Sequence, residues 1–426
     1  MKVLSIGWLA LFMLNLQVEA QSIDTTSNKQ PLAKNVVYII LDGISADILD
    51  SLETPAIDDI ASLGGYTHAM TGGLAGGYSE SPTASAIGYN NVLTGVWANK
   101  HNVYTNLILN PNYRYWSLYR LIETQKPSLV TALYSSWTDN RTKLIGMGLE
   151  EAGSFSIDIV RDGYDVVDHV IQQDSAWVRE LDNHVAKEAA TSIALDGPDF
   201  SWVYLWYPDD TGHSFGETEP HYESIRHADT QVGMIWQSVQ QRMDMYDEDW
   251  MVVVTTDHGR ALPDGRNHGG QTVREKKVWF ATNHPGVNEY FYQGDVQHVD
   301  LYPSIARYLG VEIPKELSRE LDGVSFIGPV DVSSMKASRI GTDRISLSWD
   351  SWQTEESSDP CDVDISVTVG DNYGAGQFDT YEQFATVPCS DNQATLTLPS
   401  ETIDSDTIKV LLESPHNRLN HWIISQ

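Results

Sequence analysis

The sequence predicts an α/β domain with a mixed, mostly parallel β-sheet sandwiched by helices, followed by a small all-β sandwich. Three continuous apolar segments rich in β-branched residues, each followed by an aspartate, alternate with amphipathic helical patterns. Beyond residue 331 the pattern changes to short alternating runs separated by turn-rich segments. With 426 residues the chain is also long for one core, so we expect a large domain over residues 21–330 and a smaller one over residues 331–426.

The N-terminus has the anatomy of a cleaved secretory signal peptide. Lys2 precedes an apolar run from Val3 to Leu16 that is short for a membrane span, and the segment closes with Val18-Glu19-Ala20. We therefore expect a signal peptide over residues 1–20 and a periplasmic or secreted protein, with an uncleaved anchor as the alternative. No other stretch of the sequence is apolar enough to span a bilayer.

Cysteine usage and charge limit the possible chemistry and partners. The two cysteines, Cys361 and Cys389, both lie near the C-terminus, and in an exported chain this predicts a disulfide between them rather than two free thiols. A net charge of −32 disfavours nucleic-acid duplexes and anionic membranes as partners. An anionic substrate would need a locally positive site, which metal ions can supply.

The large domain is expected to bring three aspartates to one sheet edge. Asp42 follows the predicted strand Asn35–Leu41, Asp209 follows Ser201–Tyr207, and Asp257 follows Trp250–Thr256. In open α/β sheets, ligands bind at the carboxyl ends of the strands. Further strands are predicted over Leu129–Tyr134 and Lys277–Ala281, and helices over Trp116–Thr124, Ser175–Leu195, His221–Tyr246 and Asp300–Leu309.

The second domain is predicted from its alternating runs. They are Arg344–Trp349, Val363–Val369, Ala394–Leu398 and Thr407–Leu412. This texture resembles a fibronectin type III or related immunoglobulin-like module. A stabilising or spacing unit and a module that binds a carbohydrate or a surface are the two roles that remain open.

Three aspartates and three histidines form the candidate metal site. Asp209 and His213 are four residues apart, Asp257 and His258 are adjacent, and His268 lies in a glycine-flanked loop. Together with Asp42 this set contains carboxylates and imidazoles but no thiolate, which is typical of Zn²⁺ or similar ions. Two divalent ions with three protein ligands each would leave positions open for a nucleophile and a substrate oxygen. For any single residue, a helix cap or surface group is the alternative.

Ser85 is the candidate nucleophile. It lies in the segment Glu80–Gly95 and is followed directly by helix-permissive residues, so it is expected to open a helix whose N-terminus favours an anion. Taken alone, Ser85 could equally be an N-cap. The aspartate and histidine set, which needs a nucleophile, favours the catalytic interpretation.

These residues resemble the alkaline phosphatase superfamily, and within it the nucleotide pyrophosphatase/phosphodiesterase branch. The resemblance covers about Asn35 to Gly328 and rests on Asp42, Ser85 ten residues before Gly95, Pro208-Asp209-x-x-Gly212-His213, Asp257-His258-Gly259 and His268-Gly269. It implies an alkaline phosphatase-like core. One metal would be held by Asp209, His213 and His268, and the other by Asp42, Asp257, His258 and the Ser85 oxygen. It further implies that Asn106 hydrogen-bonds the phosphoryl group and that hydrolysis passes through a phosphoseryl intermediate; a turn residue is the alternative for Asn106.

Departures from the family pattern concern the substrate. Ala86 stands where nucleotide-cleaving members have Phe, so Tyr204, Trp206 or Tyr207 would have to supply an aromatic wall. The absence of an arginine after Ser85 argues against a sulfatase. We therefore predict a two-metal phosphoesterase that hydrolyses phosphodiester or pyrophosphate bonds of a small-molecule phosphate ester. The alternatives are a phosphomonoesterase in which Arg141 and Lys143 grip the phosphate, and a non-catalytic, metal-stabilised binding protein.

Overall fold

The computed structural model describes residues 32–166, 174–352 and 361–425. The predicted signal peptide, residues 1–20, lies outside the described residues and stays a prediction. From Ala33 onward the chain forms one compact unit. The predicted domain boundary between residues 330 and 331 therefore separates two kinds of architecture that lie within this one unit.

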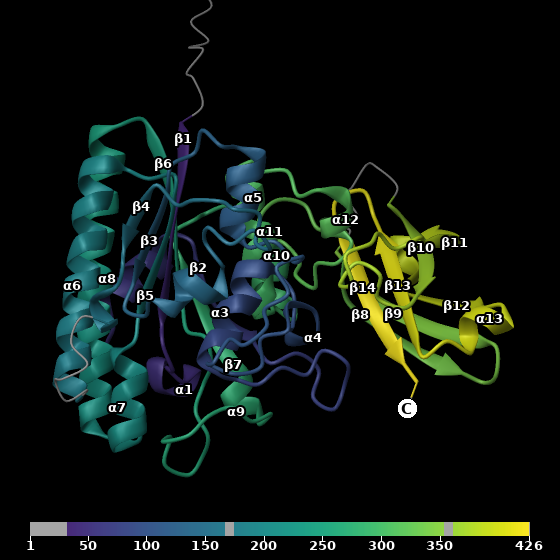
Figure 1. Cartoon of the computed structure of the whole chain (residues 1–426), viewed down its shortest axis with the longest axis horizontal. Helices are drawn as coiled ribbons and strands as arrows, with labels where there is room; N and C mark the ends of the chain where they lie inside the picture. The colour runs from purple at the N-terminus through teal and green to yellow at the C-terminus, as the bar shows by residue number, and fades with distance from the viewer. Residues whose placement is uncertain (1–31, 167–173, 353–360, 426) are drawn as a thin grey trace, which may run out of the picture. The chain divides into compact units, whose positions relative to one another are not determined.

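A seven-stranded sheet forms the centre of the first architecture (Figure 1). Its strands follow the order β2-β7-β6-β1-β5-β3-β4; β6, β1, β5, β3 and β4 pair in parallel, and β7 is antiparallel to both β6 and β2. This confirms the predicted mixed, mostly parallel sheet. The strand bounds are β1 Ala33–Leu41, β2 Gly65–Met70, β3 Thr131–Ser135, β4 Ile159–Arg161, β5 Phe200–Leu205, β6 Glu248–Thr255 and β7 Lys277–Thr282.

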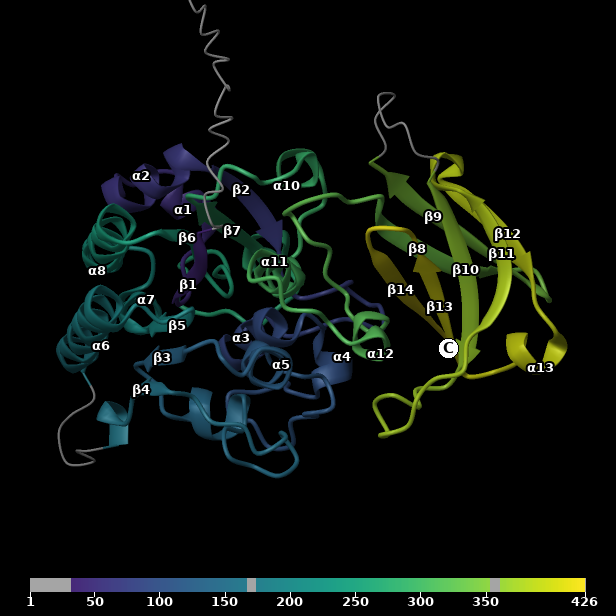
Figure 2. The same ribbon diagram turned by 90° about the horizontal axis from the view of Figure 1, so that it is seen from above.

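Helices cover both faces of this sheet because its central strand is apolar on both sides. Val37, Ile39 and Leu41 of β1 pack against α1 (Ala46–Leu49), α2 (Pro55–Leu63), α6 (Ser175–Asp196) and α8 (Glu219–Met245). The alternate residues Val36, Tyr38 and Ile40 face the opposite core. That core contains α3 (Ser85–Thr94), α5 (Leu118–Gln125), α10 (Glu289–Gln293) and α11 (Leu301–Tyr308). Figure 2 shows α6 and α8 on one side of the sheet and α3 and α5 on the other.

The remaining helical segments are short connections. They are α4 Ala98–His101, α7 Tyr207–Phe215, α9 Val273–Lys276, α12 Lys315–Ser318, the π-helical η1 Asn140–Leu144, and the 3₁₀ segments η2 Tyr164–Val166 and η3 His298–Asp300. Among the helices that the structure describes, none combines the length and the apolar character that a membrane crossing requires.

The strand that was predicted to reach Tyr207 ends at Leu205, because helix α7 begins there. Pro208 lies in the first turn of α7. The carboxylate of Asp182 accepts hydrogen bonds from the N–H groups of Trp206 and Tyr207 at the start of this helix.

The second architecture is the predicted β-sandwich, built from two antiparallel sheets with strand orders β11-β10-β13-β14 and β12-β9-β8. Its strands are β8 Val332–Ile340, β9 Arg344–Ser351, β10 Asp362–Val369, β11 Glu382–Pro388, β12 Gln393–Thr397, β13 Thr407–Glu413 and β14 Arg418–Ile424; the short helices η4 Cys389–Asp391 and α13 Ser400–Ile403 connect them. Three of these strands were not predicted. In β8 the register shifts between Ser333 and Lys336, and β11 has no fully buried face, so neither shows a clean alternation. β14, at the end of its sheet, also buries residues without strict alternation.

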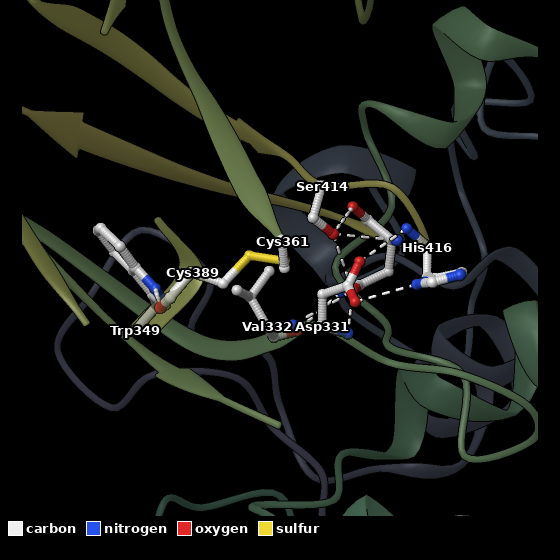
Figure 3. The surroundings of a disulfide bond; sticks show 8 residues. Asp331, Val332, Trp349, Cys361, Cys389, Ser414 and His416 are labelled. Atoms are coloured by element: carbon white, nitrogen blue, oxygen red, sulfur yellow. Dashed lines mark hydrogen bonds and ion pairs between the residues drawn. A yellow bond between two sulfur atoms is a disulfide. The ribbon is translucent and has the colours of Figure 1, made fainter. Parts of the chain in front are cut away.

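The predicted disulfide between Cys361 and Cys389 is present and joins the start of β10 to the end of β11, with the two Cα atoms 5.4 Å apart (Figure 3). The N–H of Cys389 donates to the carbonyl of Cys361, and the Trp349 indole N–H donates to the carbonyl of Cys389 at 2.8 Å. The disulfide is therefore packed inside the sandwich and fixes one end of its four-stranded sheet.

A buried network of charges joins the sandwich to the large sheet domain. The Lys409 ammonium of β13, 1% exposed, lies 3.0 Å from Glu320, 2.9 Å from Asp371 and 2.8 Å from Asp379. Beside it, the Lys100 ammonium of α4 lies 2.6 Å from Asp322 and donates to the side-chain oxygen of Asn420 at 2.7 Å. Both buried cations are thus compensated by partners from the two sides of the predicted boundary.

Replacing Lys409 by Met should strongly destabilise the protein. The substitution removes the ammonium and leaves three carboxylates facing one another, two of them buried, which costs about 3–5 kcal/mol when one partner of a buried pair is lost. Urea denaturation measures the effect. Lys336→Met, on the exposed face of β8, is the matched control and should change the free energy of unfolding by less than about 0.5 kcal/mol. A loss below about 1 kcal/mol for Lys409→Met would contradict the importance of this network.

Candidate metal centre

The three predicted aspartates converge at the carboxyl edge of the central strands. Asp42 follows β1 directly, Asp257 follows β6 by one residue, and Asp209 lies in α7, which begins after β5. Because β1 pairs with β6 on one side and β5 on the other, the three strand ends are neighbours. The histidines arrive on the same elements or on the loop after β6, and the six side chains separate into two groups.

The first group, which we call the Asp42 group, consists of Asp42, Asp257 and His258. All three are at most 1% exposed. His258 Nε2 lies 3.3 Å from Asp257 Oδ2 and 3.5 Å from Asp42 Oδ1. These same three atoms are buried and have no hydrogen-bond partner. Buried polar atoms without partners are costly, and three of them within 4.8 Å of one another are suited to a shared ligand.

The spacing of these atoms fits a metal ion. Two ligand atoms bound about 2.0–2.1 Å from a tetrahedral Zn²⁺ lie roughly 3.3–3.4 Å apart. The two measured separations within the Asp42 group, 3.3 and 3.5 Å, agree with this spacing. The donor set of two carboxylates and one imidazole is also one that Zn²⁺ accepts. The residues present therefore fit a divalent cation.

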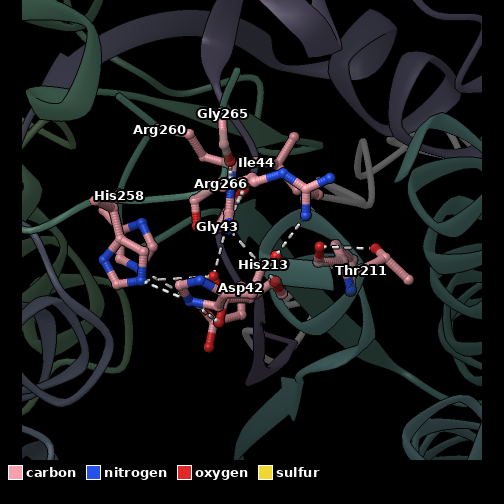
Figure 4. Close-up of polar contacts among 12 residues, drawn as sticks. Asp42, Gly43, Ile44, Thr211, His213, His258, Arg260, Gly265 and Arg266 are labelled. Atoms are coloured by element: carbon pink, nitrogen blue, oxygen red, sulfur yellow. Dashed lines mark hydrogen bonds and ion pairs between the residues drawn. The ribbon is translucent and has the colours of Figure 1, made fainter. Parts of the chain in front are cut away.

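The second group, which we call the Asp209 group, consists of Asp209, His213 and His268. His213 Nε2 lies 3.3 Å from Asp209 Oδ2 and 3.0 Å from His268 Nε2 (Figure 4). His268 Nε2 lies 3.7 Å from Asp209 Oδ1. The side chain of His213 is 46% exposed, so this group opens to solvent whereas the Asp42 group is enclosed.

Contacts behind the two groups orient the candidate ligands. Asp42 Oδ2 accepts hydrogen bonds from the phenols of Tyr204, at 2.7 Å, and Tyr89, which leaves Oδ1 for the centre of its group. Asp257 Oδ1 accepts from the Gly43 N–H at 3.0 Å, which leaves Oδ2. Such outer contacts fix a ligand's orientation and, in metalloproteins, its affinity for the metal.

The histidines are oriented in the same way. Nδ1 of His258 lies 3.0 Å from the Gly259 carbonyl, and Nδ1 of His268 lies 3.0 Å from the Thr83 carbonyl. A carbonyl can only accept, so Nδ1 carries the proton in both rings and Nε2 keeps its lone pair when the ring is neutral. Burial lowers the pKa of His268 and holds the pKa of His258 well below its usual value, which favours the neutral, ligating form.

The carboxylates of the two groups differ in their electrostatics. Burial, together with the charges of Asp257 and Asp209, raises the pKa of Asp42 well above its usual value, and burial raises the pKa of Asp257 to about 7. Burial acts in the same direction on Asp209, but the hydrogen bond with His213 and the charge of Arg260 outweigh it and hold the pKa of Asp209 well below its usual value. The Asp42 group therefore lacks a compensating cation that the Asp209 group already has.

Ser85 occupies the first position of α3, and Ala84 is the N-cap, so the structure does not use Ser85 as the cap. Gly88 and Tyr89 lie one turn further along the same helix face. A Cβ on Gly88 would come 2.8 Å from the Asp257 Cβ, and Tyr89 donates to Asp42. The face of α3 that carries Ser85 is thus packed onto the Asp42 group.

Asn106 contacts the start of this helix. Its Oδ1 accepts a hydrogen bond from the Ala86 N–H at 3.0 Å. The N–H of Ala86, the first after Ser85, is therefore engaged by Asn106 and is not free to bind a phosphoryl oxygen. The side-chain amide of the exposed Asn106 remains the donor next to the nucleophile position.

The other sequence candidates have different partners. Arg141 forms a bidentate pair with Asp162, at 2.7 and 3.0 Å, and the ammonium of Lys143 lies 2.7 Å from Asp139. Tyr204 is 2% exposed with its hydroxyl on Asp42, so it cannot form an aromatic wall for a substrate. Trp206 and Tyr207, both partly exposed, remain candidates for that wall.

Sequence reasoning missed the residues that support the ligands. Arg260, Tyr89 and Thr83 contact Asp209, Asp42 and His268 respectively. The helical spacing between Ser85 and Tyr89 was a usable signal for Tyr89. Nothing in the local sequence distinguishes Arg260, a fully buried arginine, from a surface arginine, because its partners are distant along the chain.

A mostly parallel sheet that carries this set of carboxylates, imidazoles and a helix-borne serine at its carboxyl edge defines a member of the alkaline phosphatase superfamily. The sequence pattern of the type I phosphodiesterase / nucleotide pyrophosphatase family matches residues 36–268, more than half of the chain. The chain belongs to this family.

Known proteins resemble this chain in part of its sequence or in its fold. GPI ethanolamine phosphate transferase 3 of Eremothecium gossypii is 30% identical over 122 residues, which cover 25% of this chain and 11% of that relative. Phosphonate monoester hydrolase of Agrobacterium radiobacter is 14% identical with a TM-score of 0.50, over 92% of this chain and 89% of its own. A candidate sulfatase of Bacteroides thetaiotaomicron is 12% identical with a TM-score of 0.50, over 74% and 83%. At these identities the similarity shows that each of the two structures shares its fold with this chain.

Replacing Tyr204 by Phe should weaken metal binding at the Asp42 group. The substitution removes one of the two phenols that orient Asp42, and loss of such an outer contact typically costs about 10- to 100-fold in metal affinity. Competition with a chromophoric chelator measures this affinity. Tyr134→Phe, which removes a buried phenol bonded to Ser192, is the control and should leave it unchanged. Equal affinities in the two variants would argue against the orienting role of Tyr204.

Proposed function

We propose that this protein is an exported, two-metal phosphoesterase that hydrolyses phosphodiester or pyrophosphate bonds, with Ser85 as nucleophile. The observation that carries the proposal is the set of unpaired buried atoms, Asp42 Oδ1, Asp257 Oδ2 and His258 Nε2, beneath the helix face that bears Ser85. A binding protein without catalytic function would have no use for a nucleophile at this position.

The proposed ligand sets follow the two groups. Asp42, Asp257 and His258, with the Ser85 oxygen, would hold one divalent ion, most simply Zn²⁺, and Asp209, His213 and His268 would hold the other. When bound, such ions supply positive charge that lowers the pKa of a neighbouring hydroxyl and stabilises negative charge on phosphoryl oxygens. The remaining steps are carried out by residues of the chain, namely Ser85 and Asn106.

Hydrolysis then proceeds in two displacements at phosphorus. Ser85 Oγ forms a bond to phosphorus as the bond to the leaving oxygen breaks, which gives a phosphoseryl enzyme and releases the first product as an alcohol or phosphate. A water molecule next attacks the phosphoseryl group, the P–Oγ bond breaks, and Ser85 regains its proton. An alcohol in place of water would give transfer instead, the reaction class named for the ethanolamine phosphate transferase relative.

Asn106 is proposed to bind a phosphoryl oxygen through its side-chain amide, since its Oδ1 already holds the Ala86 N–H and so fixes the orientation of the amide. The phosphomonoesterase alternative requires a cation for the extra negative charge. Because Asp162 and Asp139 engage Arg141 and Lys143, the described contacts favour a diester or pyrophosphate substrate.

Location and the role of the sandwich complete the proposal. The N-terminal sequence and the disulfide of Cys361 and Cys389 both favour export to the periplasm or the exterior. Binding of a carbohydrate or another surface by the sandwich stays a proposal. Its buried contacts with the sheet domain through Lys409 and Asn420 support a stabilising role in either case.

Replacing Ser85 by Ala should reduce hydrolysis at least about a thousandfold, because the phosphoseryl step has no other nucleophile. Metal content should remain at the wild-type value, since each group keeps its three side chains. Activity and metal analysis of the same preparations test both points. Ser62→Ala, on the exposed surface of α2, is the control. Retained activity in Ser85→Ala would exclude Ser85 as the nucleophile.

The substrate class is tested by comparing two esters. Turnover of bis-p-nitrophenyl phosphate should exceed that of p-nitrophenyl phosphate, because the structure offers no free cation at Arg141 or Lys143 for a dianionic monoester. Asp162→Asn, which frees Arg141, should shift the ratio of kcat/KM values toward the monoester if Arg141 can reach the site. A wild-type enzyme that strongly prefers the monoester would favour the phosphomonoesterase alternative.

A further inference from the structure

Arg260 makes the surroundings of the two ligand groups unequal. Its guanidinium is completely buried and donates to Asp209 Oδ1 at 2.6 Å, and also to the carbonyls of Gly265 and Gly43 (Figure 4). A second guanidinium, that of Arg266, donates to the carbonyl of His213 at 3.2 Å. Arg266 itself pairs with Asp264 at 3.6 Å, so Arg260 is the permanent positive charge that contacts a ligand side chain of the Asp209 group.

Among the described contacts, neither carboxylate of the Asp42 group has a lysine or arginine side chain as its partner. Asp42 accepts from two phenols and Asp257 accepts from a backbone N–H, all of them neutral donors. Two formal negative charges thus face the centre of this group. The Asp209 group contributes one carboxylate, and Arg260 already neutralises it at hydrogen-bond distance.

Two glycines, Gly43 and Gly212, leave room for the side chain of Arg260. A Cβ on Gly43, which adopts φ +69°, would lie 2.6 Å from Arg260 Nη1, and a Cβ on Gly212 would collide with the Arg260 guanidinium. Gly212 stands between Asp209 and His213 in α7, so the turn that presents two ligands is also the turn that leaves room for Arg260. The side chain consequently holds one fixed position behind Asp209.

This difference in charge should give the two groups different affinities for a divalent cation. A divalent cation at the Asp42 group meets two uncompensated carboxylates in an enclosed, poorly solvated position, where Coulomb attraction is strong. A cation at the Asp209 group meets a carboxylate that already shares its charge with Arg260, and His213 leaves that position open to solvent. The first position should bind tightly, and the second should exchange its ion readily.

We propose that Arg260 sets an order of metal occupancy, in which the Asp42 group binds a divalent cation first and tightly and the Asp209 group takes a second, weaker and exchangeable one. This inference rests on the proposed metal binding but goes beyond it, because it assigns unequal affinities and names the positioning residue that causes them. Catalytic activity would then follow the free metal concentration through the occupancy of the second position alone.

Titration of the metal-free protein with Co²⁺, followed by its absorption spectrum and by equilibrium dialysis, tests this proposal without any activity assay. The wild-type chain should bind two ions whose dissociation constants differ at least about tenfold. In Arg260→Met the second ion should bind about tenfold more tightly or better, because Asp209 regains its full charge, while the first constant stays unchanged. Arg260→Lys, which keeps the positive charge, should retain the gap.

Arg242→Met is the matched control, since Arg242 is a nearly buried arginine paired with Glu248 away from both groups, and it should leave both constants unchanged. Two ions of equal affinity in the wild-type protein would overturn the proposal even if Arg260→Met does not fold. An unchanged or weakened second position in folded Arg260→Met would overturn it as well. Fewer than one bound ion per chain would overturn the proposed metal centre itself, which distinguishes the two failures.

Discussion

The interaction on which the rest of this structure depends is the convergence of three carboxylates at the carboxyl edge of β6, β1 and β5. Asp42, Asp209 and Asp257 are each at most 4% exposed, and burial, together with repulsion from the neighbouring carboxylates, raises the pKa values of Asp42 and Asp257. Negative charge buried in this way is costly unless cations compensate it. The Nδ1 atoms of His258 and His268 face backbone carbonyls, so their Nε2 atoms remain available to a cation between these carboxylates.

Close packing around these carboxylates depends on missing side chains as much as on those present. Glycine at position 43 lets its backbone N–H reach Asp257 and leaves room for Arg260. Glycine at position 88 lets α3 approach the backbone of Asp257, which brings Ser85 over the Asp42 group. The proposed nucleophile is therefore carried by a helix packed directly on the candidate metal ligands, with Tyr89 as the polar link between them.

The far end of the same helix connects to the sandwich. Asp322 donates its N–H to the carbonyl of Gly95 at the end of α3 and accepts from the Trp97 N–H at 3.0 Å and from the Lys100 ammonium. Two residues earlier, Glu320 pairs with Lys409 of β13. A short chain of buried contacts thus runs from the sandwich to the helix that carries Ser85. A further acidic group among the described residues, Glu320, Asp371 and Asp379, already has its cation in the form of Lys409.

The sequence by itself determined the sheet class, the two architectures, the disulfide and the six candidate ligands, because these follow from local patterns: apolar strands, the residue that follows each strand, and motif spacing. Tertiary structure alone decided that Arg260 and Tyr204 support these ligands and that Asp162 engages Arg141. Edge strand β14 and the bulged β8 also escaped prediction. In each case the deciding contact joins residues far apart along the chain, as between Asp209 and Arg260, and burial rather than local pattern fixes the partner.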